Sequence, residues 1–234
     1  MKSVRNPEAR PARPGLESEE PWDGPFYWGR ALFRAFFWAG CRWEVQGREY
    51  VPAEGGFILA PNHTSYADPP LAGSALARPV WFMAKRELFS VPLLKHILPS
   101  VHAFPVARGT ADRRALRRAY ALLTQGKVVV IFPEGGRSPD GRLMPAEPGI
   151  ALVALRAGVP VVPMGLMGAD RVLPRSSPFP RPAKVRVRIG EPLRFDHLRG
   201  QALTRELLQA VAADIGRALA ALLPAHMGGL GGCI

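Results

Sequence analysis

Short apolar segments that alternate with helical ones constrain the fold of this 234-residue chain more than any other feature. Each apolar segment is rich in branched or aromatic residues and is bounded by Gly or Pro, which is typical of β-strands. The segments are Gly56–Ala60, Pro79–Ala84, Val101–Val106, Lys127–Phe132, Val159–Gly165 and Ala183–Ile189. Several are apolar throughout, which indicates burial on both faces of a sheet. The sequence therefore predicts an α/β fold with a largely parallel (mixed) sheet covered by helices.

The segments between these strands carry helix signals. Thr110–Gln125 has apolar residues at helical spacing; Thr110 can cap its start and Gly126 can end it. Pro148–Ala157 and Leu203–Leu223 have similar patterns. No Gly-x-Gly-x-x-Gly or P-loop pattern occurs, so the sequence gives no sign of a nucleotide-binding glycine loop.

The N-terminal region divides into two parts. Residues 1–24 combine four prolines with charges of both signs, which predicts a disordered tail. Residues 25–44 change abruptly to a crowd of aromatic side chains and predict a helix over Phe26–Ala39.

An aromatic helix that also carries Arg30 and Arg34 on one face favours a position in a membrane interface. In that interpretation the two arginines stay with lipid phosphates while large rings insert. The candidate rings are Trp28, Phe36, Phe37 and Trp38. The alternative is a helix whose rings pack into the core of the domain.

Charge points to an anionic partner. The chain has a net charge of +12, and residues 78–118 alone carry +7. Nucleic acid, an acidic membrane surface and a phosphorylated substrate all fit this excess. Cys41 and Cys233 are too few for a disulfide framework or a metal cluster, and the sequence indicates neither a cleaved signal peptide nor a spanning helix. We therefore expect a protein that stays on one side of a membrane.

His63 and Asp68 directly follow a predicted strand, where α/β sheets bind ligands. A His whose second nitrogen is held by a carboxylate is a general base. Five residues turn a regular helix by about 140°, so the pair can meet only if His63 lies in a loop and Asp68 begins the next helix. The alternative is a capped loop with a surface His.

Two further strand ends carry candidate binding groups. Glu134, Gly135 and Arg137 follow the strand Lys127–Phe132 and offer an acceptor, exposed amides and a bidentate cation, an inventory that fits a polyol phosphate. An ordinary strand-to-loop turn is the alternative. Arg108 ends a third strand, at the edge of the basic stretch.

These segments, in this order, resemble the four motif blocks of the 1-acylglycerol-3-phosphate acyltransferase family of glycerolipid acyltransferases. The resemblance covers about residues 45–195, so residues 45–234 are expected to form the acyltransferase domain. The blocks are Asn62-His63-x-Ser65-x-x-Asp68, Phe104-Pro105-Val106-x-Arg108, Phe132-Pro133-Glu134-Gly135-x-Arg137-Ser138 and Val159-Pro160-Val161-Val162-Pro163. Met83–Leu88 resembles the Lys-containing stretch that lies between the first two blocks, and it places Lys85 in the site.

The resemblance implies transfer of a fatty acyl group from acyl-CoA or acyl-carrier protein to the free hydroxyl of a lysophospholipid. His63 and Asp68 would form the catalytic base, and Arg108 with Lys85 would hold the acceptor phosphate. Glu134 with Gly135 would organise the glycerol end, Arg137 would support the phosphate site or anchor the loop, and Val159–Pro163 would form part of the wall against the donor. No cofactor, metal or covalent intermediate is expected. The expected location is peripheral, on an anionic membrane at the cytoplasmic side of the cell membrane.

Three departures affect the acceptor. The family has Gly where this chain has His102, Asp where it has Ala107, and Thr where it has Gly136. A related acyltransferase acting on another lysolipid, or on a different hydroxyl or amine acceptor, is therefore the alternative within the enzyme class. A nucleic-acid-binding protein would leave the His-Asp pair and Glu134 unexplained, and we expect no nucleic-acid partner. A non-catalytic membrane-surface protein would make His63 incidental.

Overall fold

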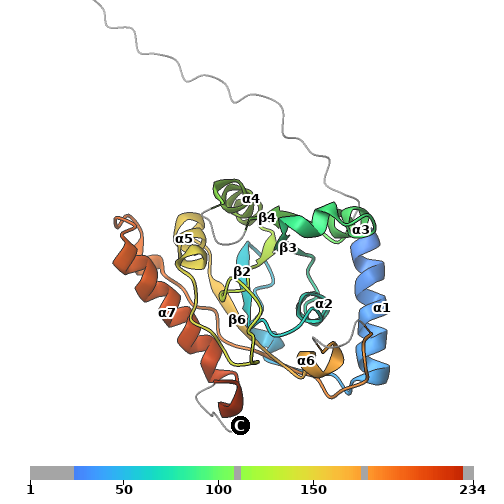
Figure 1. Ribbon diagram of the computed structural model, residues 1–234. Helices are drawn as coiled ribbons and strands as arrows, with labels where there is room; N and C mark the ends of the chain where they lie inside the picture. The colour runs from blue at the N-terminus through green and yellow to red at the C-terminus, as the bar shows by residue number, and fades with distance from the viewer. Residues whose placement is uncertain (1–23, 108–111, 175–178, 229–234) are drawn as a thin grey trace, which may run out of the picture.

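The computed structural model describes residues 24–107, 112–174 and 179–228 (Figure 1). Within these ranges seven strands form one sheet in the order β1-β7-β6-β2-β5-β3-β4. The strands are β1 Glu44–Gln46, β2 Phe57–Pro61, β3 Val80–Lys85, β4 Ala103–Val106, β5 Val128–Val130, β6 Val161–Met167 and β7 Arg186–Ile189. All neighbours are parallel except β6 and β7, which are antiparallel. This confirms the predicted largely parallel, mixed sheet.

Helices cover both faces of the sheet. They are α1 Gly24–Gly40, α2 Asp68–Ala75, α3 Leu94–Ser100, α4 Arg113–Thr124, α5 Pro148–Ala157, α6 Ala169–Val172 and α7 Arg205–Ala221. Short 3-10 helices span Arg48–Tyr50, Arg86–Ser90, Asp196–Leu198 and Ala225–Met227. Figure 1 shows α4, α5 and α7 on one side of the central strands β2 and β6, and α1, α2 and α6 on the other.

The central strand β2 is buried on both faces, as its continuous apolar sequence predicts. Phe57 and Leu59 belong to the core cluster on the α1–α2 side, whereas Ile58 and Ala60 belong to the cluster under α4, α5 and α7. The alternation follows from the two-residue period of a strand. The centre of the sheet is therefore a rigid platform for the loop that follows β2.

Helix α4 begins later than predicted. Thr110 lies outside the described residues, and the N-cap is Asp112, whose side chain accepts the backbone N–H groups of Arg114 and Ala115. A carboxylate is as good an N-cap as a hydroxyl, so Asp112 can take the role that the sequence pattern assigns to Thr110. Helix α5 matches its predicted bounds, and α7 is shorter than predicted by two residues at each end.

Helix α1 confirms the predicted helix over Phe26–Ala39. The predicted tail, residues 1–24, falls almost entirely outside the described residues. One side of α1 packs on the domain: Phe26 and Phe37 lie in the core, and Arg30 donates hydrogen bonds to the carbonyl groups of Leu76 and Ala77 at the end of α2.

The other side of α1 is exposed and apolar. Trp28 is 75% exposed and Leu32 72% exposed. The expectation that Phe37 inserts into a membrane is therefore wrong, because its ring is only 1% exposed, and Phe36 is half-buried against the same core. Arg30, which was expected to contact lipid phosphates, instead binds carbonyl groups of the protein. Among the described residues, no helix combines the length and the apolar character that crossing a membrane would take.

Candidate active site

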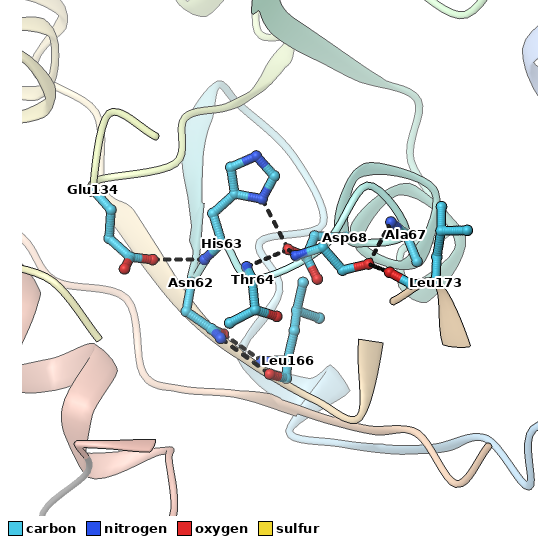
Figure 2. A network of polar contacts seen from close by, with 9 residues as sticks. Asn62, His63, Thr64, Ala67, Asp68, Glu134, Leu166 and Leu173 are labelled. Atoms are coloured by element: carbon cyan, nitrogen blue, oxygen red, sulfur yellow. Dashed lines mark hydrogen bonds and ion pairs between the residues drawn. The ribbon is translucent and has the colours of Figure 1, made fainter. Parts of the chain in front are cut away.

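The loop that follows β2 is tied to the neighbouring strand β6. The side chain of Asn62 donates from Nδ2 to the carbonyl of Leu166 at 3.1 Å and accepts the N–H of the same residue at 2.6 Å. The two bonds imitate one rung of a β-ladder, as Figure 2 shows. The backbone directly before His63 is thereby fixed at the carboxyl end of the central strands.

His63 and Asp68 meet where the loop ends and α2 begins. The Nδ1 atom of His63 lies 2.8 Å from Oδ2 of Asp68 (Figure 2). The same carboxylate oxygen accepts the backbone N–H groups of Thr64 at 2.6 Å and Ser65 at 2.7 Å. The five-residue spacing therefore places the two groups together, with His63 in the loop and Asp68 as the first residue of α2.

The Asp68 carboxylate does not cap α2. It accepts amides upstream of α2, whereas the N-cap residue is Ala67, which makes no side-chain hydrogen bond to the helix. Pro69 lies in the first turn of α2, where proline is well tolerated. Complete burial raises the pKa of the Asp68 carboxyl, and the hydrogen bonds from His63, Ser65 and Thr64 oppose that rise. The donors around Asp68 thus stabilise its charged form in a buried place.

The imidazole of His63 is held on a second side by a ring. It stacks on Phe132, with the ring centroids 4.0 Å apart and the planes inclined by 25°. Since Asp68 binds Nδ1, the other nitrogen, Nε2, is the one left to accept a proton. Figure 2 shows Nε2 on the side of the ring away from Asp68. Neighbouring groups thus determine the position, orientation and tautomer of this imidazole.

Glu134 binds two separate stretches of backbone. Its Oε1 accepts the N–H of His63 at 2.6 Å, and its Oε2 accepts the N–H of Met144 at 2.9 Å. Burial raises the pKa of Glu134 to about 7, against the opposing effect of these two hydrogen bonds. Ser138 adds another link, because its N–H donates to the carbonyl of His63 at 2.8 Å. The third motif block therefore supports the backbone of the first.

Gly135 and Gly136 differ in what they require. Gly135 has φ +67°, and a Cβ atom there would lie 3.2 Å from the side chain of Glu147, whereas a Cβ atom at Gly136 would have no heavy atom within 4 Å. Gly135 thus serves a turn that favours glycine. Arg137 lies over the ring of Tyr66, 3.6 Å from its centroid, so this cation sits beside the His63 loop.

Of the other two predicted cations, Lys85 lies toward the β3–β4 edge of the sheet. Lys85 is the last residue of β3, half-exposed, with its Nζ 3.7 Å from a carboxylate oxygen of Glu87. Arg108 lies outside the described residues. Its segment follows β4, and Asp112 binds both sides of it: Oδ2 accepts the N–H of Ala107 at 2.9 Å, and Oδ1 caps α4.

His102 does not belong to the candidate site. It lies before β4, at the amino end of that strand, whereas His63 lies at the carboxyl ends. Its φ of +61° explains why glycine suits the position. Its ring stacks between Trp81 and Phe26, with centroids 4.5 and 5.1 Å away, so it joins α1 to the sheet. The departure at His102 therefore changes the attachment of α1 and leaves the loops around His63 untouched.

The fourth motif block, Val159–Pro163, runs into β6, and two of its three valines point into the core. Val161 and Val162 are fully buried in β6, one in each core cluster. Their side chains pack the sheet.

Comparison with known proteins identifies the family of this chain. The sequence model described as "Acyltransferase" matches residues 42–167, which is more than half of the chain. A 1-acyl-sn-glycerol-3-phosphate acyltransferase of Bacillus subtilis is 31% identical over 176 residues, covering 72% of this chain and 85% of the relative. The chain belongs to the acyltransferase family.

Two further relatives support the same family assignment. The 1-acyl-sn-glycerol-3-phosphate acyltransferase of Pseudomonas aeruginosa is 28% identical over 189 residues, covering 80% of this chain and 72% of the relative. The crystal structure of the 1-acyl-sn-glycerophosphate acyltransferase PlsC from Thermotoga maritima matches with a TM-score of 0.67 at 27% identity. It covers 85% of this chain and 77% of that one. The family recognised from the motif blocks is confirmed, and so is the α/β fold.

Some residues support the site through contacts that no sequence pattern indicates. Phe132 belongs to the predicted strand and to the third motif block, but neither pattern predicts that its ring supports His63. The amide of Asn62 and the carboxylate of Asp112 act on backbone groups distant in sequence or across an undescribed loop. Bonds of that kind depend on which strands are neighbours, and only the fold reveals them.

Proposed function

We propose that this acyltransferase moves a fatty acyl group from an acyl thioester to the free hydroxyl of 1-acylglycerol-3-phosphate, giving phosphatidic acid. The observation that carries the proposal is the 2.8 Å contact between His63 and Asp68 in a loop held from three sides. The acceptor class is that of the relatives, which are named as 1-acyl-sn-glycerol-3-phosphate acyltransferases.

His63 is the proposed general base. Its Nε2 takes the proton of the acceptor hydroxyl as the hydroxyl oxygen attacks the thioester carbon, and Asp68 stabilises the imidazolium that forms. A new C–O bond forms, the C–S bond breaks, and the departing sulfur receives the proton from the imidazolium. The products are an ester and a free thiol. Because the thioester is already activated, the reaction requires no covalent enzyme intermediate, metal or cofactor.

Cations toward the β3–β4 edge are the proposed acceptor-phosphate site. Lys85 is the last residue of β3, Arg108 follows the neighbouring parallel strand β4 in the sequence, and Arg137 follows β5. Guanidinium groups bind phosphate bidentately, which favours Arg108 as the main contact. Glu134 already uses both carboxylate oxygens on backbone amides, so we assign it, with Gly135, the shaping of the loop at the glycerol end.

The acceptor lipid requires contact with a membrane. The exposed side of α1, including Trp28 and Leu32, is the proposed insertion surface, and the basic stretch 78–118 supplies attraction to anionic headgroups. This defines a peripheral protein, for which we propose the cytoplasmic face of the cell membrane.

The direct test supplies purified full-length protein with lysophosphatidic acid and acyl-CoA. Phosphatidic acid and free thiol should appear in equal amounts, and a panel of other lysolipids should react more slowly. Preference for a neutral lysolipid or an amine would contradict the proposed acceptor. Thiol release without a lipid product would contradict acyl transfer itself.

A further inference from the structure

A basic groove lies on the β6–β7 side of the candidate site. It has a volume of about 350 Å³ and is lined by residues from the end of β6, from β7 and from the segment after α7. Its cations are Arg171, Lys184, Arg186 and Arg188, and its carboxylates are Asp140 and Asp170. The groove reaches Thr64, the residue next to His63.

The cations of the groove are unequally paired. Lys184 and Arg186 both contact Glu44, at 2.9 and 3.2 Å. By contrast, neither Arg171 nor Arg188 has an ion pair with a carboxylate of the residues that the structure describes, and Arg188 is half-buried. A guanidinium that is partly removed from water without a counter-charge favours binding of an anion.

A second polar group supports a ligand here. The hydroxyl oxygen of Thr64 is buried and has no hydrogen-bond partner within the described part of the chain. Thr64 is 6% exposed and forms the end of the groove beside His63. Buried hydroxyl groups are normally satisfied, so this one is available to a bound molecule.

Sheet order separates this groove from the proposed acceptor-phosphate site. The loop with His63 follows β2, and Lys85 ends β3, two strands away on one side. Arg186 and Arg188 belong to β7, two strands away on the other side. The sheet thus presents cations on both sides of His63, and a transfer reaction brings two substrates to one base.

We propose that the groove binds the phosphorylated nucleotide end of an acyl-coenzyme A donor. This inference rests on the proposed transfer from a thioester. Coenzyme A carries a pyrophosphate and a further phosphate on its ribose, and its pantetheine arm ends in the thioester. The nucleotide lies among the arginines while the arm extends past Thr64 toward His63.

The form of the groove favours a nucleotide over the acidic surface of a carrier protein. Arg186 and Arg188 are two residues apart and therefore lie on the same face of β7. Their Cα atoms are about 6.6 Å apart along the strand, a spacing that suits phosphates separated by a sugar. The volume lies at the small end of the range for small-molecule pockets, whereas a protein partner covers roughly 800 Å² of open surface.

Binding of adenosine 3′,5′-bisphosphate to the full-length protein tests the site without catalysis. Calorimetry should show binding to the wild type and a roughly tenfold loss of affinity in Arg188→Ala, with a larger loss when Arg171→Ala is added. Arg194→Ala is the matched control: this exposed arginine follows Leu193, which pairs with Val161 at the amino end of β6. Equal affinity in the wild type and the double variant would overturn the site, as would no binding to the wild type.

Kinetics identify the substrate that the groove serves. In Arg188→Ala the KM for acyl-CoA should rise roughly tenfold, while the KM for lysophosphatidic acid and the kcat/KM for acyl-pantetheine, which lacks the nucleotide, stay unchanged. A rise confined to lysophosphatidic acid would make this the acceptor site. A loss of kcat/KM confined to acyl-(acyl-carrier protein) as donor would make the groove a protein-docking surface. An equal loss of kcat/KM with acyl-CoA and with acyl-pantetheine would indicate a structural role. Each of these results overturns the inference. If the wild type makes no phosphatidic acid, the proposed function fails, and nucleotide binding still decides the groove.

Discussion

Oδ2 of Asp68 accepts hydrogen bonds from Nδ1 of His63 and from two backbone amides at once, so one buried oxygen fixes both the loop and the imidazole. Asp68→Asn keeps the shape and removes the charge. We expect kcat to fall roughly 10²–10⁴-fold, because an amide cannot stabilise the imidazolium. Thiol release at saturating substrates measures this effect. A near-normal kcat in a variant with unchanged circular dichroism would argue against Asp68 as the partner of the base.

Glu134 gives a pH dependence of stability with a defined sign. Its pKa is raised from 4.5 to about 7 in the folded protein. Between these values the folded state holds a proton that the unfolded chain has released, so the free energy of unfolding falls as the pH rises. In Glu134→Gln the side chain does not titrate, so this pH-dependent part of the free energy of unfolding is absent.

Urea unfolding of both proteins at several pH values between 4 and 8 measures the Glu134 effect. The stability of the wild type relative to Glu134→Gln should decrease as the pH rises through this window. A constant difference, or one that grows with pH, would contradict the assigned direction.

The adjacent glycines of the third motif block form a matched pair. Gly135→Ala places a side chain at φ +67°, and we expect the free energy of unfolding to fall by about 1–2 kcal/mol. Gly136→Thr enters open space and should leave stability nearly unchanged. Denaturant unfolding of the two variants compares them. Equal destabilisation would show that the turn at Gly135 does not require glycine.

Membrane attachment should depend on the exposed side of α1 and not on its buried side. Trp28→Ala with Leu32→Ala should weaken binding to anionic vesicles at high salt by about tenfold or more without changing Tm, because ring burial is not screened by salt. Phe37→Ala is the control for the buried side. It should lower the free energy of unfolding by roughly 3–5 kcal/mol. Vesicle binding by the double variant equal to that of the wild type at high salt would make α1 solely a structural element.

The sequence predicted the sheet and the position of the site because both depend on local patterns. Buried parallel strands such as β2 are continuous apolar runs, and His63 and Asp68 follow one of them. Strand β1, only three residues long, exists through its pairing with β7 and has no such run. Helix α3 contains Pro99, which hides a helical pattern.

The division of α1 into two sides was beyond the sequence. Its aromatic residues surround the helix, and only the position of the sheet and α2 decides that Phe37 is buried while Trp28 is exposed. The same holds for His102, a departure from the family pattern that packs against Trp81 and Phe26 instead of the acceptor loops. Contacts between elements distant in sequence determine both outcomes.

Turnover by His63→Ala tests the proposed base most directly, with His197→Ala as the control, since His197 is an exposed histidine in a 3-10 helix outside the site. Phosphatidic acid formation from lysophosphatidic acid and acyl-CoA should fall roughly 10²–10⁴-fold in His63→Ala and remain normal in His197→Ala. A folded His63→Ala protein that makes phosphatidic acid at close to the wild-type rate would contradict the account.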